Sequence, residues 1–393
     1  MSRQESGESQ AVSFWNDPRV RSRLFQIILV LLVGVVAYDI AMNTARNLAS
    51  RNIASGYEFL SRTSGFDVVF SLIEYSSSSN YGRALLVGFL NTLLVACLGI
   101  VLATILGFLI GVMRLSKNWL VSRAATLYVE FIRNVPLLLQ IFIWYNLVLK
   151  PLPDARNAIK FWDFGALSNK GLTLPSPIFG DGAWTIPLGL LLAVIASYAI
   201  RRWATARQAE TGQTFPAGLA GMGLIVFLPI VLFALAGWPV TLDYPVMGSF
   251  SFRGGATLVP EFIAMLLALS IYTAAFIAEA VRAGIQAISH GQTEAARALG
   301  LRSGPTMRLI IIPQAMRVII PPMTSQYLNL TKNSSLAVAI AYPDLVATGG
   351  TTLNQTNQAI EIVVIWMVVY LSLSLLTSGF MNWFNSRVRL VER

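Results

Sequence analysis

The sequence is poor in two residues that carry much of protein chemistry. Its 393 residues include one cysteine, Cys97, and one histidine, His290. A lone cysteine inside an apolar run forms neither an internal disulfide bond nor a thiolate metal site. With a single histidine, metal catalysis and histidine acid–base chemistry have little support. The sequence therefore predicts no metal site and no catalytic residue.

Charged residues are also scarce. They make up 12% of the chain, against about 25% in soluble domains, while 55% of the residues are hydrophobic. One soluble core could not keep so much apolar surface from water, whereas a bilayer can. The net charge of +10 does not indicate nucleic-acid binding, because the basic residues are spread through short segments between apolar runs.

Long apolar runs are abundant and predict an all-α, polytopic membrane helix bundle. A helix needs about 20 mostly apolar residues to cross a bilayer. Eight stretches come close to this length, at 24–42, 84–113, 126–149, 184–200, 217–237, 259–281, 322–342 and 361–384. Residues 1–23 are polar, and the first run ends in no small-residue cleavage pattern, so this run is predicted to be a retained span rather than a signal peptide.

The basic residues predict the orientation. With a cytoplasmic N-terminus, the inner segments hold 18 Lys and Arg residues and the outer segments hold nine. This twofold bias favours two cytoplasmic termini and requires an even number of spans. The inner segments are 1–23, 114–125, 201–216, 282–321 and 385–393. The outer segments 43–83 and 150–183 are predicted to be loops or short interfacial helices, because they are rich in serine, proline and tryptophan.

The inner segment 282–321 is long for a connection between bundle helices, which indicates a function of its own. Residues 293–299 are predicted to form a short helix that Gly300 ends, and a second apolar stretch begins near Met307. Two small helices joined by a glycine turn would form a knob able to dock into a partner's groove. An amphipathic helix lying on the membrane surface is the alternative from periodicity alone.

The same segment resembles the EAA loop of ABC import permeases. The residues that carry the resemblance are Glu294, Ala295, Ala296, Gly300, Ile310, Ile312 and Pro313, with Ile312 where the family usually has leucine. The resemblance implies that Glu294, Ala295, Ala296, Gly300 and Pro313 contact a cytoplasmic ATPase. The chain has no G-x-x-x-x-G-K-S/T loop. It is therefore predicted to be a transport subunit and not an enzyme, with no cofactor of its own and with ATP and Mg²⁺ used by the partner.

Two further regions resemble the polar amino-acid permeases. They are GFLNTL at 88–93 with the following glycines, and YVEFIRNVPLLLQIFIWY at 128–145. The resemblance implies the five-span core of a type I importer, with a first part at 84–149 and a second part at 259–393. The extra pieces are 1–83 and the insertion 150–258, whose outer loops flank a two-span hairpin. These pieces resemble the Q-type permease of general L-amino-acid importers.

The resemblance also implies partners. These are ATPase subunits, a second related permease in a heterodimer, a periplasmic amino-acid-binding protein and the amino acid itself, in a bacterial inner membrane. Nothing in the sequence identifies which amino acids are carried, and a homodimer stays open. The 150–258 insertion is equally compatible with a partner contact and with a filler hairpin.

Polar residues inside spans provide the remaining candidates. Lys332 stands in the seventh apolar stretch, where an ion must face a wet cavity or a partner. A substrate pathway is predicted at Asn329, Lys332, Asn333, Ser334 and Ser335. The alternative is that Lys332 lies nearer the interface, or satisfies backbone carbonyls at a break after Pro321-Pro322. Glu130 and Arg133 share a helix face and are predicted to pair near an inner gate.

Other classes of function compete with an ATP-driven importer. An ion-gradient-driven transporter of small polar solutes would need intramembrane acidic residues, and only Glu279 lies well inside a span. A membrane-embedded enzyme would need a cluster of histidine or acidic residues at the membrane face. A scaffold without transport activity is the third alternative.

Overall fold

The computed structural model describes residues 18–50, 56–162, 164–249 and 251–388. Its helices are α1 (Pro18–Ser50), α2 (Tyr81–Arg114), α3 (Trp119–Asn134), α4 (Leu137–Phe142), α5 (Thr185–Thr211), α6 (Ala217–Leu235), α7 (Pro260–Gln286), α8 (His290–Ala298), α9 (Ser303–Thr306), α10 (Ile312–Asn333), α11 (Leu345–Thr356) and α12 (Ala359–Val388). Short 3₁₀ or π segments are η1 (Glu58–Ser61), η2 (Ile143–Leu149), η3 (Ala155–Asn157), η4 (Met307–Ile311) and η5 (Ser334–Ile340).

The helices confirm the predicted membrane bundle. Within the described ranges, six helices are long and apolar enough to cross a membrane, and two bent helix pairs raise the number to eight. The bent pairs are α3 with α4–η2, at 104°, and the segment from α9 to η5 with α11, at 53°. The first bend falls at Pro136, which has no backbone N–H to continue the helix. The six single helices and two bent pairs lie where the eight apolar runs predicted them.

The centre of the bundle is the close packing of α2 along α7. Gly107 and Gly111 make it possible, because a Cβ at Gly107 would lie 2.6 Å from the side chain of Ile277. A Cβ at Gly111 would lie 2.8 Å from Val281. Small residues of this kind let two backbones approach within a membrane. Two regions far apart in the sequence, 84–149 and 259–393, are therefore joined in space.

A buried polar cluster fixes the opposite end of α2, away from α8. The Asn91 amide donates to the carbonyls of Phe70 and Pro343, at 2.8 and 2.9 Å. Asp344 caps α11 by accepting a hydrogen bond from Ala347 N at 2.8 Å. These bonds satisfy the backbone of the irregular turn between η5 and α11, which an apolar environment would otherwise leave unpaired.

Helix α10 corrects the predicted start of the seventh span. The helix begins at Ile312 and passes through Pro321 and Pro322, so the predicted break after these prolines is wrong. Each proline removes a helical hydrogen bond and is costly within a helix. Both are exposed, while Ile319 and Ile320 on the other side are buried in the core. Packing of that side against α7 keeps α10 helical as far as Asn333.

The outer part of the insertion contains strands, whereas 150–183 was predicted to form loops or short interfacial helices. A four-stranded antiparallel sheet has the order β1 (Ile159–Phe161), β2 (Gly165–Ser168), β3 (Gly171–Leu174), β8 (Ala256–Leu258). Two ribbons join β4 (Ser176–Phe179) to β5 (Val240–Asp243), and β6 (Val246–Met247) to β7 (Phe252–Arg253). Strands from both sides of the hairpin α5–α6 pair here, which no local pattern indicated.

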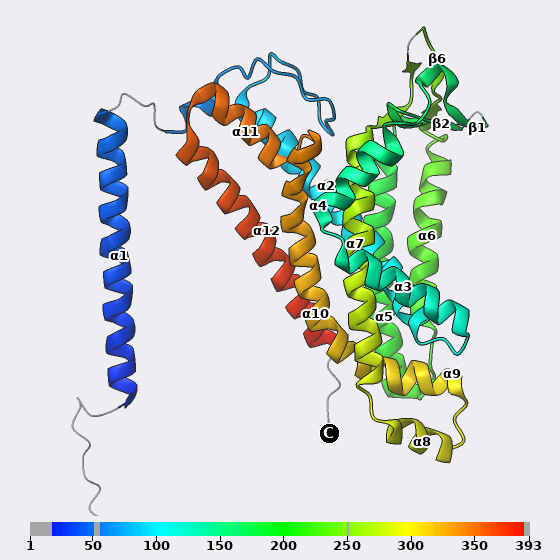
Figure 1. Cartoon of the computed structure of the whole chain (residues 1–393). Coiled ribbons are helices and arrows are strands. Elements are labelled where there is room, and N and C mark those ends of the chain that lie inside the picture. Colours follow the sequence, from blue (N-terminus) through cyan, green and yellow to red (C-terminus); the bar gives the residue numbers. More distant parts are fainter. Residues whose placement is uncertain (1–17, 51–55, 163, 250, 389–393) are drawn as a thin grey trace, which may run out of the picture.

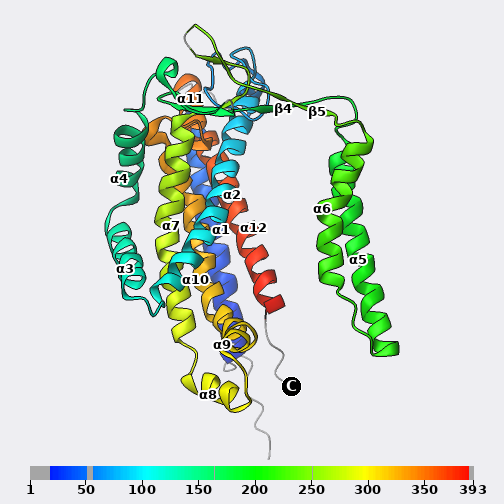
Figure 2. The same ribbon diagram turned by 90° about the vertical axis from the view of Figure 1, so that its right-hand side faces the viewer.

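The hairpin α5–α6 stands apart from the rest of the bundle (Figure 2). Its two helices pack on each other, and the β4–β5 ribbon connects them to the sheet. Gly189 of α5 lies against Pro229 of α6, with room for no Cβ. Helix α1 is likewise exposed over residues 21–40. Exposed apolar helices of this kind are suited to lipid.

Candidate functional site

The short helix α8 projects beyond the end of the bundle where α7 ends and α10 begins (Figure 1). It starts after Ser289, whose hydroxyl accepts a hydrogen bond from the N–H of Gly291 at 3.3 Å. It is followed by Gly300, whose φ of +76° is strained for any residue with a side chain. The predicted helix with a glycine terminator is confirmed. The second predicted small helix is instead the start of a longer one, because α9 runs through η4 into α10.

The residues of the EAA pattern divide between an exposed tip and a packed base. Glu294 and Ala295 are exposed, whereas Ala296 is 1% exposed. In the part of the chain that the structure describes, Glu294 forms no ion pair. A fixed carboxylate without an internal partner is available to a second protein. The next large hydrophobic residue, Leu299, is 80% exposed and extends this surface.

Pro313 lies at the junction between the α8 region and the membrane-spanning part of α10. It follows the π-helical turn η4 and stands at the start of α10. Because proline cannot donate a backbone hydrogen bond, the preceding turn is free to widen. Gln314 of α10 connects this helix to α8, since its Nε2 donates to Gln292 Oε1 at 3.2 Å. The same Nε2 also donates to the Ile310 carbonyl at 3.1 Å. Helix α8 is thus attached to α10 by a side-chain bridge as well as by the chain.

One face of α10 is exposed and polar. Ser325, Asn329 and Lys332 lie on it at helical spacing, beyond the two exposed prolines. No large hydrophobic side chain is exposed between 319 and 337, all of which are described. A lysine and an asparagine at this depth are costly against lipid. The face therefore suits a wet pathway or a polar partner.

The other predicted pathway residues are less accessible. Ser334 is 1% exposed and donates to the Thr331 carbonyl at 2.8 Å, so it belongs to the packing and does not line the exposed face. Ser335 donates to the Lys332 carbonyl at 2.8 Å, and Asn333 is half-buried. The structure brings Asn329 and Lys332 together on one face and leaves the serines bonded to the backbone.

A group of charges that the sequence did not predict lies near the C-terminal end of α7. Glu279 accepts a hydrogen bond from Arg282 at 2.5 Å and one from Arg114 at the end of α2. Arg133, at the end of α3, lies 3.9 Å from the same carboxylate. This group is called the Glu279 cluster below. It connects α2, α3 and α7 just before the chain enters α8, and partial burial strengthens its ion pairs relative to exposed ones.

The predicted pair of Glu130 with Arg133 is wrong as an ion pair. Among the described residues, Arg133 contacts Glu279 and lies 5.2 Å from the ring centre of Phe276, and no ion pair joins it to Glu130. An exposed pair three residues apart contributes only a few tenths of a kcal/mol. A partly buried carboxylate on a neighbouring helix attracts the guanidinium more strongly. A role of either residue in a gate stays a prediction.

The amino-acid sequence is similar to those of known proteins. The family described as "binding-protein-dependent transport system inner membrane component" matches residues 185–390. The general L-amino acid transport system permease protein AapQ of Rhizobium johnstonii is 56% identical over 96% of this chain and 94% of its own length. The chain belongs to this family of inner membrane transport components.

Two other members are similar over nearly their whole lengths. The putative amino-acid ABC transporter permease protein YhdX of Escherichia coli is 50% identical over the whole of both chains. The glutamate/glutamine/aspartate/asparagine transport system permease protein BztB of Rhodobacter capsulatus is 45% identical over 96% of each chain. The resemblance to ABC permeases is confirmed, and with it the prediction of a multi-pass transport component that is not an enzyme.

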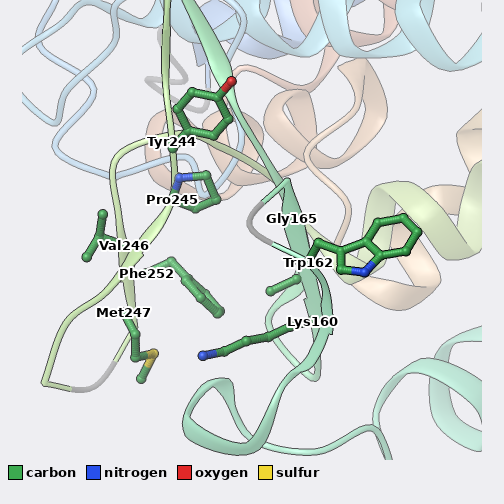
Figure 3. A pocket seen from close by; sticks show the side chains of 9 residues that line it. Lys160, Trp162, Gly165, Tyr244, Pro245, Val246, Met247 and Phe252 are labelled. Carbon is green, nitrogen blue, oxygen red and sulfur yellow. The ribbon is translucent and has the colours of Figure 1, made fainter.

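The β segment, at the end of the molecule away from α8 (Figure 1), forms a second candidate surface. A cavity of about 310 Å³ opens between β1–β2 and the β6–β7 ribbon. The side chain of Lys160 extends toward Met247 and Phe252, while the indole of Trp162 projects away from them (Figure 3). Trp162 is 93% exposed and has a φ of +51°. Exposed aromatic residues on a folded segment are typical of protein contacts.

No other chemistry is indicated at these sites. Within the described ranges, no group of three or more His, Cys, Asp or Glu residues is close enough to hold a metal ion. The candidate functional features among the described residues are the exposed α8, the polar face of α10 and the Glu279 cluster.

Proposed function

We propose that the chain is the transmembrane permease subunit of an ATP-driven amino-acid importer. The family match and the names of the three relatives support this assignment. The observation that carries the coupling role is α8, an exposed helix with an unpaired carboxylate that is attached directly to two membrane-spanning helices. The proposed location is a bacterial inner membrane with both termini in the cytoplasm. Helix α1 begins and α12 ends toward the end that carries α8, which agrees with this orientation (Figure 1).

The proposed partner of α8 is a separate cytoplasmic ATPase. Glu294, Ala295 and Gly300 would enter a groove of that subunit, with Ala296 and Pro313 holding the knob in place. Helix α8 presents the carboxylate and Leu299 together, which gives one ionic and one apolar contact. The Glu279 cluster would keep α2, α3 and α7 together at the point where force from the ATPase arrives.

The proposed pathway runs along the exposed face of α10. Asn329 and Lys332 would contact the solute, with the lysine attracting the α-carboxylate of an amino acid and the amide orienting it. Ser335 and Asn333 lie beside this face and have a lesser role. A second, related permease would supply the opposite wall, because the face is open to the outside of this chain.

The proposed mechanism is alternating access. A periplasmic binding protein delivers an amino acid at the end away from α8, where the β segment lies. ATP then closes the two ATPase subunits, and α8 transmits the closure to α7 and α10. Because α8 is bonded to α10 through Gln292 and Gln314, movement of the knob changes the position of the polar face. The chain itself holds and orients the solute and performs no bond chemistry.

The assignment is tested by purifying the tagged chain from its native membranes in a mild detergent and identifying the proteins that co-purify. The expected result is an ATPase with a phosphate-binding loop and a second permease. Glu294→Lys is expected to reduce the recovered ATPase at least about tenfold, since it replaces attraction by repulsion at a contact centre. The second permease should remain.

The matched control is Glu210→Lys, which reverses an exposed glutamate at the end of α5. It should leave ATPase recovery unchanged. Recovery of the chain alone, or equal loss with both variants, would overturn the coupling role. The leading alternative would then be an ion-gradient-driven transporter of small polar solutes. Glu279, the acid that such a mechanism would use, is bound by arginines at the inner end of α7, which disfavours it.

A further inference from the structure

The hairpin α5–α6 has the dimensions and end groups of a lipid-embedded pair. Trp184 precedes α5 and Trp203 lies in its second half. At about 1.5 Å per residue, the axial distance between them is about 28 Å, close to the thickness of a bilayer core. Both indoles are exposed, at 65% and 49%. They therefore mark the two membrane interfaces, and the second interface lies toward the α8 end of the molecule (Figure 2).

A cavity of about 400 Å³ lies between the two helices at this second interface. Val194 and Ile225 form an apolar wall, and Arg201 lines the same cavity about two turns nearer the end of α5. On the α6 side, Gly218 leaves the cavity open, because a Cβ there would meet no atom within 4 Å. Gly221 instead lets the two helices approach, since a Cβ there would lie 3.2 Å from the Ser197 side chain. The interior of the cavity is thus apolar, and one cationic group lies at its mouth.

The arginines around the mouth have no carboxylate partner. No ion pair joins Arg201 or Arg202 to an acidic side chain within the described residues. Arg202 lies 5.8 Å from the ring centre of Tyr198. Arg207 lies outside the cavity, where it donates to Gln213 Oε1 at 3.0 Å and lies 5.2 Å from the ring centre of Trp203. Arg201 also lines an adjoining open depression with Arg202. Uncompensated guanidinium groups at an interface favour a phosphate, which they bind in a forked geometry.

We propose that this cavity binds one anionic phospholipid. Its phosphate contacts Arg201, and an acyl chain lies along Val194 and Ile225 between the helices. Charge complementarity selects an anionic headgroup, and the apolar wall distinguishes a lipid from a free phosphate. Basic pockets between membrane helices on the cytoplasmic side bind such headgroups in general. The site would anchor the hairpin in the bilayer, and it does not depend on which solute the chain carries.

The test is a lipid titration of the full chain, purified in detergent with its co-purifying subunits and followed by native mass spectrometry. The probes are phosphatidylglycerol, phosphatidylcholine and inorganic phosphate. Wild-type protein is expected to retain phosphatidylglycerol in preference to phosphatidylcholine, and millimolar phosphate should not displace it. Arg201→Gln should weaken the binding of phosphatidylglycerol at least about fivefold, as expected for a lost charge-assisted hydrogen bond.

Gly218→Leu tests the cavity separately from the charge. A Cβ at Gly218 meets no atom within 4 Å, so leucine can enter the space without distorting the helices. Gly218→Leu should weaken the binding of phosphatidylglycerol while leaving the net charge of the protein unchanged. The controls are Arg207→Gln, which removes a charge outside the cavity, and Gly223→Leu, which adds a side chain at another open glycine of α6. Both should bind the lipid as the wild type does.

Four results would overturn the proposal. Equal weakening by Arg201→Gln and Arg207→Gln would indicate diffuse attraction with no site. Equal retention of the two lipids would exclude headgroup recognition. Complete displacement by inorganic phosphate would identify a small-anion site, and absence of lipid from the wild-type complex would indicate that protein covers the hairpin.

Discussion

Helices α10 and α12 pack against each other, and each leaves one face exposed. On α10 that face carries Ser325, Asn329 and Lys332, while on α12 it carries Met367 and Leu371, which are 66% and 60% exposed. Lipid accepts the second face and not the first. An exposed helix face in an isolated membrane subunit can therefore contact either lipid or a polar environment, and the polarity of its side chains distinguishes the two cases. The apolar face is a lipid surface, whereas the polar face requires water or a partner subunit.

The largest effect is expected when a charge is placed on the apolar face. Met367→Lys puts an ammonium against lipid, at a cost of about 3 kcal/mol at the bilayer centre. We expect several-fold less protein in carbonate-washed membranes, measured by quantitative immunoblot. Asn329→Lys on α10 is the control and should insert normally. Equal loss of both variants would show that the two faces do not differ.

The reciprocal change on the polar face should spare insertion and impair transport. Lys332→Met removes the charge proposed to attract a carboxylate, so the half-saturating amino-acid concentration should rise about tenfold, or about 1.4 kcal/mol. The measurement is uptake into proteoliposomes with the complete transporter. Lys117→Met, on the exposed turn between α2 and α3, is the control. Unchanged half-saturation for Lys332→Met would remove this lysine from the pathway.

The smallest effect is expected at Ser335, which only bonds the carbonyl of Lys332. Ser335→Ala should change stability by less than about 0.5 kcal/mol and uptake by less than twofold. Ser334→Ala removes a buried hydrogen bond to Thr331. It should cost about 1 kcal/mol and lower the melting temperature of the purified protein. A larger effect on uptake at Ser335 than at Ser334 would reverse the assignment made from burial.

Local features were predictable from the sequence. The eight spans follow from the length of each apolar run, which depends only on neighbouring residues. Helix α8 and the turn at Gly300 follow in the same way, because a cap, a polar helix and a glycine are contiguous. The coupling candidates were named from the resemblance of the same contiguous segment to the EAA loop.

Features that depend on several helices were not predictable. The Glu279 cluster brings together the ends of α2, α3 and α7, so spacing along one helix suggested the wrong partner for Arg133. The helix through Pro321 and Pro322 survives because of packing on its other side, which a local pattern does not record. Predicting the exposed polar face of α10 likewise requires knowing which side of the helix α7 covers. The sequence contained one indication of the cluster. Glu279 stands three residues before Arg282, near the end of a span.

The unbroken helical path from Ser303 through η4 and α10 to Ile340 gives the molecule a lever. Pro313 lies near its inner end and Lys332 about 28 Å farther along the axis. A tilt of about 10° around Pro313 would swing the ammonium group by about 5 Å, roughly the width of an amino-acid backbone. Small rotations at the end near α8 would thus become displacements the size of an amino acid, because an unbroken helix joins Pro313 to Lys332.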